Sequence, residues 1–295
     1  MTRREWWMGS VAAWQLRSQG APPEAPLAIP VTKVGRLDRP KGASIYYEVT
    51  GSGPPIVFAH GLSGSHLSWW QQVPYFSGRY TCITFSHRGW GLSTDAPDGP
   101  HTTEFADDLA ALVDHLKLAP VRLIAQSMGG WTCLAYALRH RDKVRGLVLA
   151  GTAGGLDPSR LAIDQDAAKA SSEWRTQVAQ RGIQGAAGER MAREQPALYF
   201  LYHQIHLSSP GLNRATVLEQ LRSASTVDPR AVAALKIPML ILYGEEDNGW
   251  PTYVAAAKAA PGARVAAVAK AGHSVYFERP AEFNRIVNDF LQSVG

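Results

Sequence analysis

Short apolar runs alternate with longer stretches of helical spacing along most of the chain after Pro30. The short runs are bounded by Gly and Pro and are rich in β-branched residues, which is typical of strands. The longer stretches repeat apolar residues every three or four positions, as amphipathic helices do. This alternation predicts an α/β fold in which helices flank a mostly parallel, eight-stranded sheet. Seven of the strands can be located at Ser44–Val49, Ile56–Ala59, Tyr80–Phe85, Val121–Ala125, Val144–Ala150, Met239–Tyr243 and Arg264–Val268.

The helical stretches between these runs carry one apolar face each. The spacing predicts a helix over 104–116, with Thr102 or Thr103 as its amino-terminal cap. Further helices are expected over 132–140, 252–260 and 281–294. We expect all of them to be surface helices that bury one face on the sheet.

Residues 151 to about 234 interrupt the alternation, because they contain helical spacing but no convincing strand. Helices are expected there over 161–181, 186–193, 197–205 and 212–225. This pattern predicts a helical cap at 153–227, inserted into a core made of 31–152 and 228–295. The aromatic residues of the cap are spaced so that some are expected to face away from its own core and line a pocket, with core packing as the alternative for each. They include Tyr199, Phe200, Tyr202 and His203.

The amino-terminal segment, residues 1–30, has a composition of its own. Arg3 and Arg4 precede a short apolar stretch, and a Pro- and Ala-rich segment follows. This order is typical of a twin-arginine export signal, and the alternative is a cytoplasmic protein with an amino-terminal extension. Localisation therefore stays open between the periplasm and the cytoplasm. No stretch reaches the roughly 20 apolar residues that a membrane-spanning helix needs, so no membrane insertion is expected.

Composition and charge narrow the class of protein. The chain has 295 residues, of which 45% are hydrophobic and 19% charged, as in a soluble globule with a large core. The formal net charge is +5, but the basic residues are scattered, which argues against a nucleic-acid partner. Cys82 and Cys133 are interpreted as packing residues. The oligomeric state is not indicated.

The strongest chemical signal lies where the run 121–125 ends. Ser127 follows this apolar run, has small residues two positions before and after it, Ala125 and Gly129, and precedes a predicted helix. A serine on a sharp strand-to-helix turn projects its hydroxyl above the sheet, and small neighbours let the helix pass close by. The pattern therefore predicts a nucleophile elbow at Ser127, with an amino-terminal cap as the structural alternative.

A second turn supplies hydrogen-bond donors of the kind such a serine needs. The run 56–59 leads directly into His60, Gly61 and Leu62. The backbone N–H of Leu62 and that of Met128, at the helix start, are the expected oxyanion-hole donors. The side chain of His60 is interpreted as structural, because the backbone of this turn does the chemical work.

A serine hydroxyl needs a base, and the base needs a carboxylate that fixes its tautomer. The run 239–243 is followed by Asp247 and the run 264–268 by His273, so both stand after the carboxyl end of a predicted strand. We predict Ser127 as nucleophile, His273 as general base and Asp247 as the orienting acid. Glu245 or Glu246 is the alternative acid.

Taken together, these motifs resemble the α/β-hydrolase superfamily from about residue 43 to the end. The resemblance includes the turn at His60 and Gly61, the loop 86–93 and the three turns that carry Ser127, Asp247 and His273. Two departures are Ala125, where the family usually has Gly, and Ser86, where the loop usually opens with Asp. We expect the loop to be structural and the change to Ser86 to affect local hydrogen bonds.

The resemblance implies hydrolysis of a carboxylic ester or lactone through an acyl-enzyme, with a small molecule as the partner. No cofactor is implied, and no metal, because no His, Asp, Glu or Cys cluster has ligand spacing. A serine nucleophile argues against the dehalogenases and epoxide hydrolases of the superfamily, which use aspartate. For the pocket, the candidates are Trp131, Trp250 and Tyr199, each with core packing as its alternative.

Three other functions stay open. Carbon–carbon bond hydrolases of ring-cleavage products share the cap and the serine turn, but usually have Asn before the serine and Trp after the histidine, whereas this chain has Gln126 and Ser274. A perhydrolase would share the three catalytic residues. A non-catalytic ligand receptor on the same fold is the alternative from outside enzymology.

Overall fold

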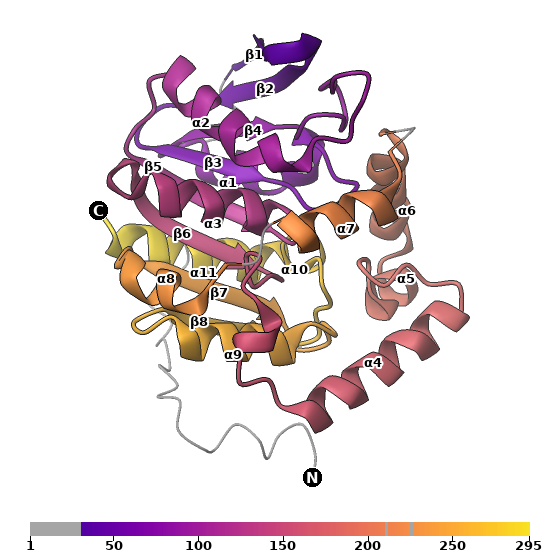
Figure 1. Ribbon diagram of the computed structural model, residues 1–295. Helices are drawn as coiled ribbons and strands as arrows, with labels where there is room; N and C mark the ends of the chain where they lie inside the picture. Colours follow the sequence, from indigo (N-terminus) through magenta and orange to yellow (C-terminus); the bar gives the residue numbers. More distant parts are fainter. Residues whose placement is uncertain (1–30, 210–211, 225–226) are drawn as a thin grey trace.

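The computed structural model describes residues 31–209, 212–224 and 227–295, and its strands form a single sheet (Figure 1). The strands are β1 (Thr32–Asp38), β2 (Ser44–Thr50), β3 (Pro55–Ala59), β4 (Thr81–Phe85), β5 (Val121–Gln126), β6 (Val144–Ala150), β7 (Met239–Gly244) and β8 (Arg264–Val268). They lie in the order β1-β2-β4-β3-β5-β6-β7-β8. Only the pairs β1–β2 and β2–β4 are antiparallel in this sheet. The predicted α/β fold with a mostly parallel, eight-stranded sheet is confirmed.

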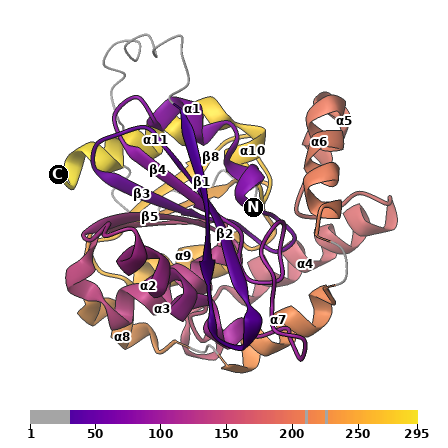
Figure 2. The same ribbon diagram turned by 90° about the horizontal axis from the view of Figure 1, so that it is seen from above.

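The central strands are buried on both faces, as continuous apolar runs predict. In β3, Ile56 and Phe58 belong to one core cluster, while Val57 and Ala59 belong to the other. One cluster is covered by α1 (Gln72–Phe76), α10 (Val275–Glu278) and α11 (Pro280–Ser293). The opposite cluster is covered by α2 (Phe105–His115), α3 (Gly129–Arg139), α8 (Pro229–Leu235) and α9 (Trp250–Ala259). Figure 2 shows the sheet between these two helical layers.

The chain between β6 and β7 holds most of the helices that do not cover the sheet. They are α4 (Gln165–Gln180), α5 (Glu189–Glu194), α6 (Pro196–Leu207) and α7 (Arg214–Ala224), and they lie to one side of the sheet in both views (Figures 1 and 2). An isolated parallel bridge pairs Leu156 with Val227, so the two ends of this stretch meet. Residues 153–227 are called the cap segment below.

Single 3₁₀ turns connect several of these elements, at Pro40–Gly42, His66–Trp69, Thr102–Glu104, Arg141–Lys143 and Pro158–Arg160. One of them corrects the predicted start of α2. Neither Thr102 nor Thr103 caps this helix, because both lie in the preceding turn and the residue at the cap position, Glu104, makes no side-chain capping bond. The Thr102 hydroxyl instead donates to Gln220 in α7, 3.2 Å away.

Four of the strands and α-helices were not located from the sequence: β1, α1, α8 and α10. The eighth strand is β1, an edge strand whose side chains are mostly exposed, so its sequence contains no apolar run. Helix α8 has seven residues and buries only Pro229, Val232 and Leu235, which is too few to show a helical period. Helices α1 and α10 have five and four residues. The three missed helices are therefore too short for a helical period to be recognised in the sequence.

Other expectations concern single residues and segments. Cys82 and Cys133 are buried free thiols, as predicted for packing residues. The predicted twin-arginine signal falls on residues 1–30, outside the described residues. Within the part of the chain that the structure describes, no helix is both long enough and apolar enough to cross a membrane.

A buried ion pair joins α2 to the loop that follows β4. The carboxylate of Asp108 accepts two hydrogen bonds from Arg88, at 2.7 and 2.6 Å, and one from Arg39 at 2.8 Å. The side chains of Asp108 and Arg88 are only 2% and 4% exposed. Removal of one partner would leave the other charge buried without compensation, which is the costly case for such pairs.

We therefore expect Asp108→Asn to lower the free energy of unfolding by about 3 kcal/mol, measured by urea denaturation. Asp107→Asn is the matched control, because Asp107 lies in the same helical turn but pairs with Arg139 where both side chains are about half exposed. That substitution should cost less than about 1 kcal/mol. Equal losses in the two variants would contradict the assignment of Asp108 as the buried anchor of this loop.

Candidate active site

Ser127 lies on the turn between β5 and α3, and its backbone is held in an uncommon conformation. Its φ angle is +48°, in the left-handed region that non-glycine residues rarely adopt. The turn is fixed because the Ser127 N–H donates to the Ala150 carbonyl and the Gly130 N–H donates to the Ser127 carbonyl, at 3.0 and 2.9 Å. This conformation is that of a nucleophile elbow, and strain of this kind is common at functional sites.

Two glycines allow the neighbouring turns to approach Ser127 closely. A Cβ on Gly61 would lie 3.1 Å from the Ser127 Cβ and would also overlap the Gln126 side chain, whereas a Cβ on Gly129 would meet the carbonyls of Ala59 and His60. The turn after β3 is thus packed directly on the β5–α3 turn. Ala125, where the family usually has Gly, lies in β5 and is fully buried in the hydrophobic core, so its methyl group packs among apolar side chains.

The predicted oxyanion-hole residues flank this contact. Leu62 directly follows Gly61, and Met128 is the residue at the amino-terminal cap of α3. Among the described residues, neither the Leu62 nor the Met128 N–H donates to another backbone carbonyl. Two backbone donors on either side of Ser127 are therefore available to a ligand.

His273 and Asp247 are brought together by the turns after β8 and β7. The Asp247 Oδ2 lies 2.9 Å from His273 Nδ1. The Asp247 side chain is fully buried, while that of His273 is 18% exposed. Burial lowers the pKa of His273, but the adjacent Asp247 carboxylate outweighs this effect and raises the pKa above its ordinary value.

The Asp247 carboxylate has a second hydrogen-bond partner. Its Oδ1 accepts from the Gly249 N–H at 2.9 Å. An ionised carboxylate only accepts, so we assign the shared proton to His273 Nδ1. The Nε2 atom of His273 is then free to accept a proton. No hydrogen bond joins Ser127 to His273 in the described chain, and such contacts in hydrolases commonly tighten only when substrate binds.

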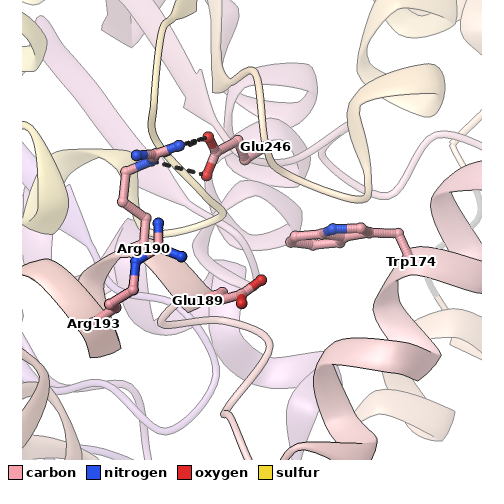
Figure 3. A pocket seen from close by; sticks show the side chains of 5 residues that line it. All are labelled: Trp174, Glu189, Arg190, Arg193 and Glu246. Atoms are coloured by element: carbon pink, nitrogen blue, oxygen red, sulfur yellow. Dashed lines mark hydrogen bonds and ion pairs between the residues drawn. The ribbon is translucent and has the colours of Figure 1, made fainter.

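The alternative acid Glu246 has a different partner. Arg190 of α5 donates to Glu246 through Nη2 at 2.6 Å and through Nε at 3.1 Å. Figure 3 shows this pair in a small cleft lined by Trp174, Glu189, Arg190, Arg193 and Glu246. The Glu246 side chain therefore joins the cap segment to the β7–α9 turn, and Asp247 is the acid that contacts His273.

His60 is fully buried and belongs to a chain of hydrogen bonds. Its Nε2 accepts from the His87 backbone N–H at 2.9 Å, so the proton of a neutral ring stands on Nδ1 and donates to the Gly61 carbonyl at 2.8 Å. Burial lowers the pKa of His60 to about 3. The ring of His87 lies next in the chain, 3.1 Å from His60 Nε2 and 2.9 Å from the Thr132 hydroxyl. These contacts fit the structural interpretation of His60.

The loop that opens with Ser86 is held by a different set of bonds. The Ser86 hydroxyl lies 3.1 Å from the His66 backbone N–H and 3.0 Å from His66 Nδ1. The Ser86 carbonyl accepts from the Ser93 hydroxyl at 2.7 Å. Ser86 is completely buried, so a hydroxyl here organises the loop without reaching solvent.

The three pocket candidates lie in different surroundings. Trp131 is half-buried and shares a small apolar cluster with Leu62 and Met128. Trp250 opens α9, and its N–H donates to the Asp247 carbonyl at 3.3 Å. The hydroxyl of Tyr199 accepts from the Gln184 N–H at 3.3 Å, within the cap segment. Trp131 and Trp250 thus lie beside the candidate site, and Tyr199 contacts the cap segment.

The sequence analysis missed Glu278, a buried carboxyl close to His273. Both of its oxygens lie 3.1 Å from the Gly272 N–H. Burial raises the pKa of Glu278 to about 7, against the smaller opposing effect of the Gly272 bond. A glutamate directly after the apolar stretch 275–277 was the one signal that could have indicated a buried carboxyl.

The described residues contain no group of three or more His, Cys, Asp or Glu side chains arranged to hold a metal ion. The candidate site consists of a hydroxyl, an imidazole, a buried carboxylate and free backbone N–H groups. Such a set is suited to nucleophilic attack on a carbonyl and stabilisation of the resulting oxyanion.

Comparison with known proteins places the chain in a family. A family model described as the alpha/beta hydrolase fold matches residues 54–224. The chain belongs to this family of hydrolases, which confirms the resemblance.

Individual relatives are similar over most of their length. A Mycobacterium tuberculosis protein whose name assigns it to the non-heme bromoperoxidases (BpoC) is 29% identical over 265 residues, which are 85% of this chain and 98% of the relative. An esterase structure from Thermogutta terrifontis is 25% identical with a TM-score of 0.71, and covers 89% of this chain and 99% of its own. The structure of Est816, an N-acyl homoserine lactone degrading enzyme, is 26% identical with a TM-score of 0.69. The match covers 87% of this chain and 100% of Est816. Esterases, lactone-degrading enzymes and haloperoxidases are thus among the relatives.

The raised pKa of Glu278 has a consequence for stability. Between its ordinary value of roughly 4.3 and about 7, the folded protein binds a proton at Glu278 that the unfolded chain does not hold. Stability contributed by this group is therefore present at low pH and is lost as the pH rises through this window.

We expect Glu278→Gln, which cannot ionise, to remove this loss. The free energy of unfolding is measured for both proteins at pH 5 and at pH 8. The difference between variant and wild type should shift in favour of the variant by about 1–3 kcal/mol from pH 5 to pH 8. A parallel pH dependence in wild type and variant would show that Glu278 is already ionised in the folded protein at pH 5.

Proposed function

We propose that this protein is a serine hydrolase that cleaves a carboxylic ester or lactone through an acyl-enzyme. In this proposal Ser127 is the nucleophile, His273 the general base and Asp247 the orienting acid. The cap segment, residues 153–227, covers a core made of 31–152 and 228–295. The observation that carries the proposal is the 2.9 Å contact of His273 Nδ1 with a fully buried Asp247. This pair follows the carboxyl ends of β8 and β7, at the same edge of the parallel sheet as the Ser127 turn after β5.

The proposed reaction begins when Ser127 Oγ attacks the substrate carbonyl carbon and His273 Nε2 takes the hydroxyl proton. The resulting oxyanion accepts hydrogen bonds from the N–H groups of Leu62 and Met128. His273 then gives its proton to the leaving alcohol oxygen, which stays attached to the acyl group when the substrate is a lactone. Water attacks the acyl-enzyme in the same way and regenerates Ser127.

Several observations support this assignment of roles. The proton on His273 Nδ1 is held by Asp247, which leaves Nε2 as the acceptor. The Asp247 carboxylate would stabilise the imidazolium that forms when the base accepts a proton, as the raised pKa of His273 indicates. The relatives named as an esterase and as a lactone-degrading enzyme support an ester or lactone as the substrate class.

A perhydrolase activity is the second candidate. It is favoured by the bromoperoxidase name of a relative that matches 85% of this chain, and it would use the same three residues. Bromination of a dye in the presence of peroxide and a short carboxylic acid tests it, with Ser127→Ala as the control.

The proposed nucleophile is tested with a panel of p-nitrophenyl esters of rising chain length and a set of lactones. We expect wild type to hydrolyse members of this panel and to be labelled at Ser127 by a fluorophosphonate probe. Ser127→Ala should lose both, with a fall in kcat of about 10⁴-fold or more.

Two results would contradict the proposal. Hydrolysis that persists in Ser127→Ala would exclude this residue as nucleophile. A wild type that neither reacts with the probe nor turns over the panel would favour the carbon–carbon hydrolase, which ring-cleavage products would reveal, or the ligand receptor.

The assignment of the acid predicts a pH dependence. Because His273 acts as base only when neutral, kcat/KM should rise with pH, with a midpoint above the ordinary imidazole value of about 6.5. Asp247→Asn should lower kcat by about 10⁴-fold and move the midpoint downward, since the charge that raises the pKa is gone.

Glu246→Gln is the matched control for this substitution, because Glu246 pairs with Arg190 and not with His273. Its rate and its midpoint should stay near those of wild type. If Glu246→Gln were the variant that lost activity and Asp247→Asn were not, the roles of the two acids would have to be exchanged.

A further inference from the structure

The residues that neighbour Asp247 and His273 in the chain form hydrogen bonds with the cap segment. Glu246 and Asn248 stand on either side of Asp247, and Ser274 follows His273. Each of these three neighbours has a hydrogen-bond partner in the cap segment. Within the described residues, the side chains of Asp247 and His273 have no such partner there. The cap segment therefore acts on this pair indirectly, through its chain neighbours.

Two helices of the cap segment hold the turn of the acid. On one side of Asp247, Arg190 of α5 donates to the Glu246 carboxylate through Nη2 at 2.6 Å and through Nε at 3.1 Å (Figure 3). On the other side, the Ser171 hydroxyl of α4 donates to the Asn248 carbonyl at 2.5 Å. Ser171 is 3% exposed, so water does not compete for this bond. The turn is thus held both before and after Asp247.

Two other parts of the cap segment hold the turn of the base. The Ser274 hydroxyl donates to the Ala186 carbonyl at 2.7 Å. Because this bond uses the only proton of the Ser274 hydroxyl, the Tyr202 hydroxyl of α6 is the donor in the 2.8 Å bond to Ser274. Ser274 is completely buried and Tyr202 is 3% exposed. Directly after His273, one hydroxyl therefore both donates to the cap segment and accepts from it.

The stretch 186–190 shows that the cap segment is packed into the core at this point. Its first residue bonds to the turn of the base and its last residue to the turn of the acid. Ala187 is fully buried in the same apolar cluster as Ala271. A Cβ on Gly272 would lie 3.4 Å from the Gly188 Cα, so the two backbones pack closely. This part of the cap segment is therefore fixed against both turns.

We propose that Ser171 and Ser274 are positioning residues, through which the cap segment fixes the orientation of the Asp247 and His273 side chains. The inference rests on the proposed serine hydrolase function, in which this pair forms the acid and the base. Neither serine hydroxyl forms a hydrogen bond with the side chain of Asp247 or His273 in the described chain. Each acts on the turn that carries one of them.

The core by itself joins the two turns only through their backbones. The Glu246 N–H donates to the Ala271 carbonyl at 2.9 Å, so the turns should stay side by side when one cap contact is lost. Proton transfer is more sensitive than this, because a misplacement of about 1 Å can cost a factor of about 100 in rate. A lost cap bond should therefore lower kcat by less than that factor. KM should change little, since substrate binding does not require the exact placement of the base.

The test uses the full chain and compares Ser171→Ala and Ser274→Ala with wild type on p-nitrophenyl acetate. Each substitution removes one hydroxyl that ties the cap segment to one turn. We expect kcat to fall about 10-fold in each variant, with KM within about two-fold of wild type. Tyr202→Phe removes only the donor to Ser274, so it is the milder change at the turn of the base and should show a smaller fall in kcat.

Ser93→Ala is the matched control for the loss of a buried serine hydroxyl. The Ser93 hydroxyl donates to the Ser86 carbonyl at 2.7 Å and accepts from the Tyr46 N–H at 2.8 Å, so it makes as many bonds as that of Ser274. Neither partner belongs to the turn of the acid or of the base. The control should keep the kcat of wild type, and thermal unfolding of all variants separates a loss of rate from a loss of fold. Wild-type kcat in both cap variants would overturn the inference, as would an equal fall in the control.

The pKa of His273 is a readout that needs no turnover. Burial lowers this pKa, but the Asp247 carboxylate outweighs burial and raises it, so a displaced carboxylate should let it fall toward about 6.5. NMR titration of the His273 ring should show this fall in Ser171→Ala and Ser274→Ala but not in Ser93→Ala. If wild type hydrolyses no ester, the proposed function fails while the lowered pKa still supports the inference. An unchanged pKa in both cap variants would overturn the inference whether or not the protein is a hydrolase.

Discussion

The parallel register of the central strands is the constraint on which the candidate site depends. Strands β3, β5, β6, β7 and β8 run in the same direction, so their carboxyl ends lie at one edge of the sheet. The backbone hydrogen bonds between parallel strands continue into the turns that follow them. There the Ser127 N–H donates to the Ala150 carbonyl, and the Gly151 N–H donates to the Leu242 carbonyl. Residues separated by more than 200 positions in the chain therefore meet at one edge, and no flexible loop has to hold them.

Two buried carboxyl groups near His273 show that the effect of burial on a carboxyl group depends on its hydrogen-bond donors. The Asp247 carboxylate accepts from the Gly249 N–H and from His273 Nδ1, so each of its oxygens has a donor. Among the described residues, the Glu278 carboxyl accepts from the Gly272 N–H alone, and burial raises its pKa to about 7. The first carboxylate can orient an imidazole, whereas the second has a raised pKa and holds the turn before His273.

The sequence predicts the strand-end turns well because the signal is local there. An apolar run followed by small residues marks Ser127, Leu62 and Asp247 directly, and the structure locates these turns where the pattern predicts them. The contact of Tyr202 with Ser274 could not be predicted, because it depends on packing between segments that are distant in sequence. Glu278 lies only six positions from its partner Gly272, but the sequence does not show that its carboxyl group is buried. The Tyr202 bond, for example, spans 72 positions, and helical spacing in α6 cannot show which of its aromatic residues face the core.

The arrangement of the cap segment has a mechanical consequence. In the hydrolase proposed here, the core supplies all the groups that would act on a carbonyl, yet the turns that carry them are also the surfaces on which α5 and α6 rest. Arg190 contacts the turn of Asp247, and Tyr202 contacts the turn of His273. A displacement of α5 and α6 would then disturb the turns of the base and its acid together. Substitutions in the cap segment are therefore restricted at the residues that make these hydrogen bonds.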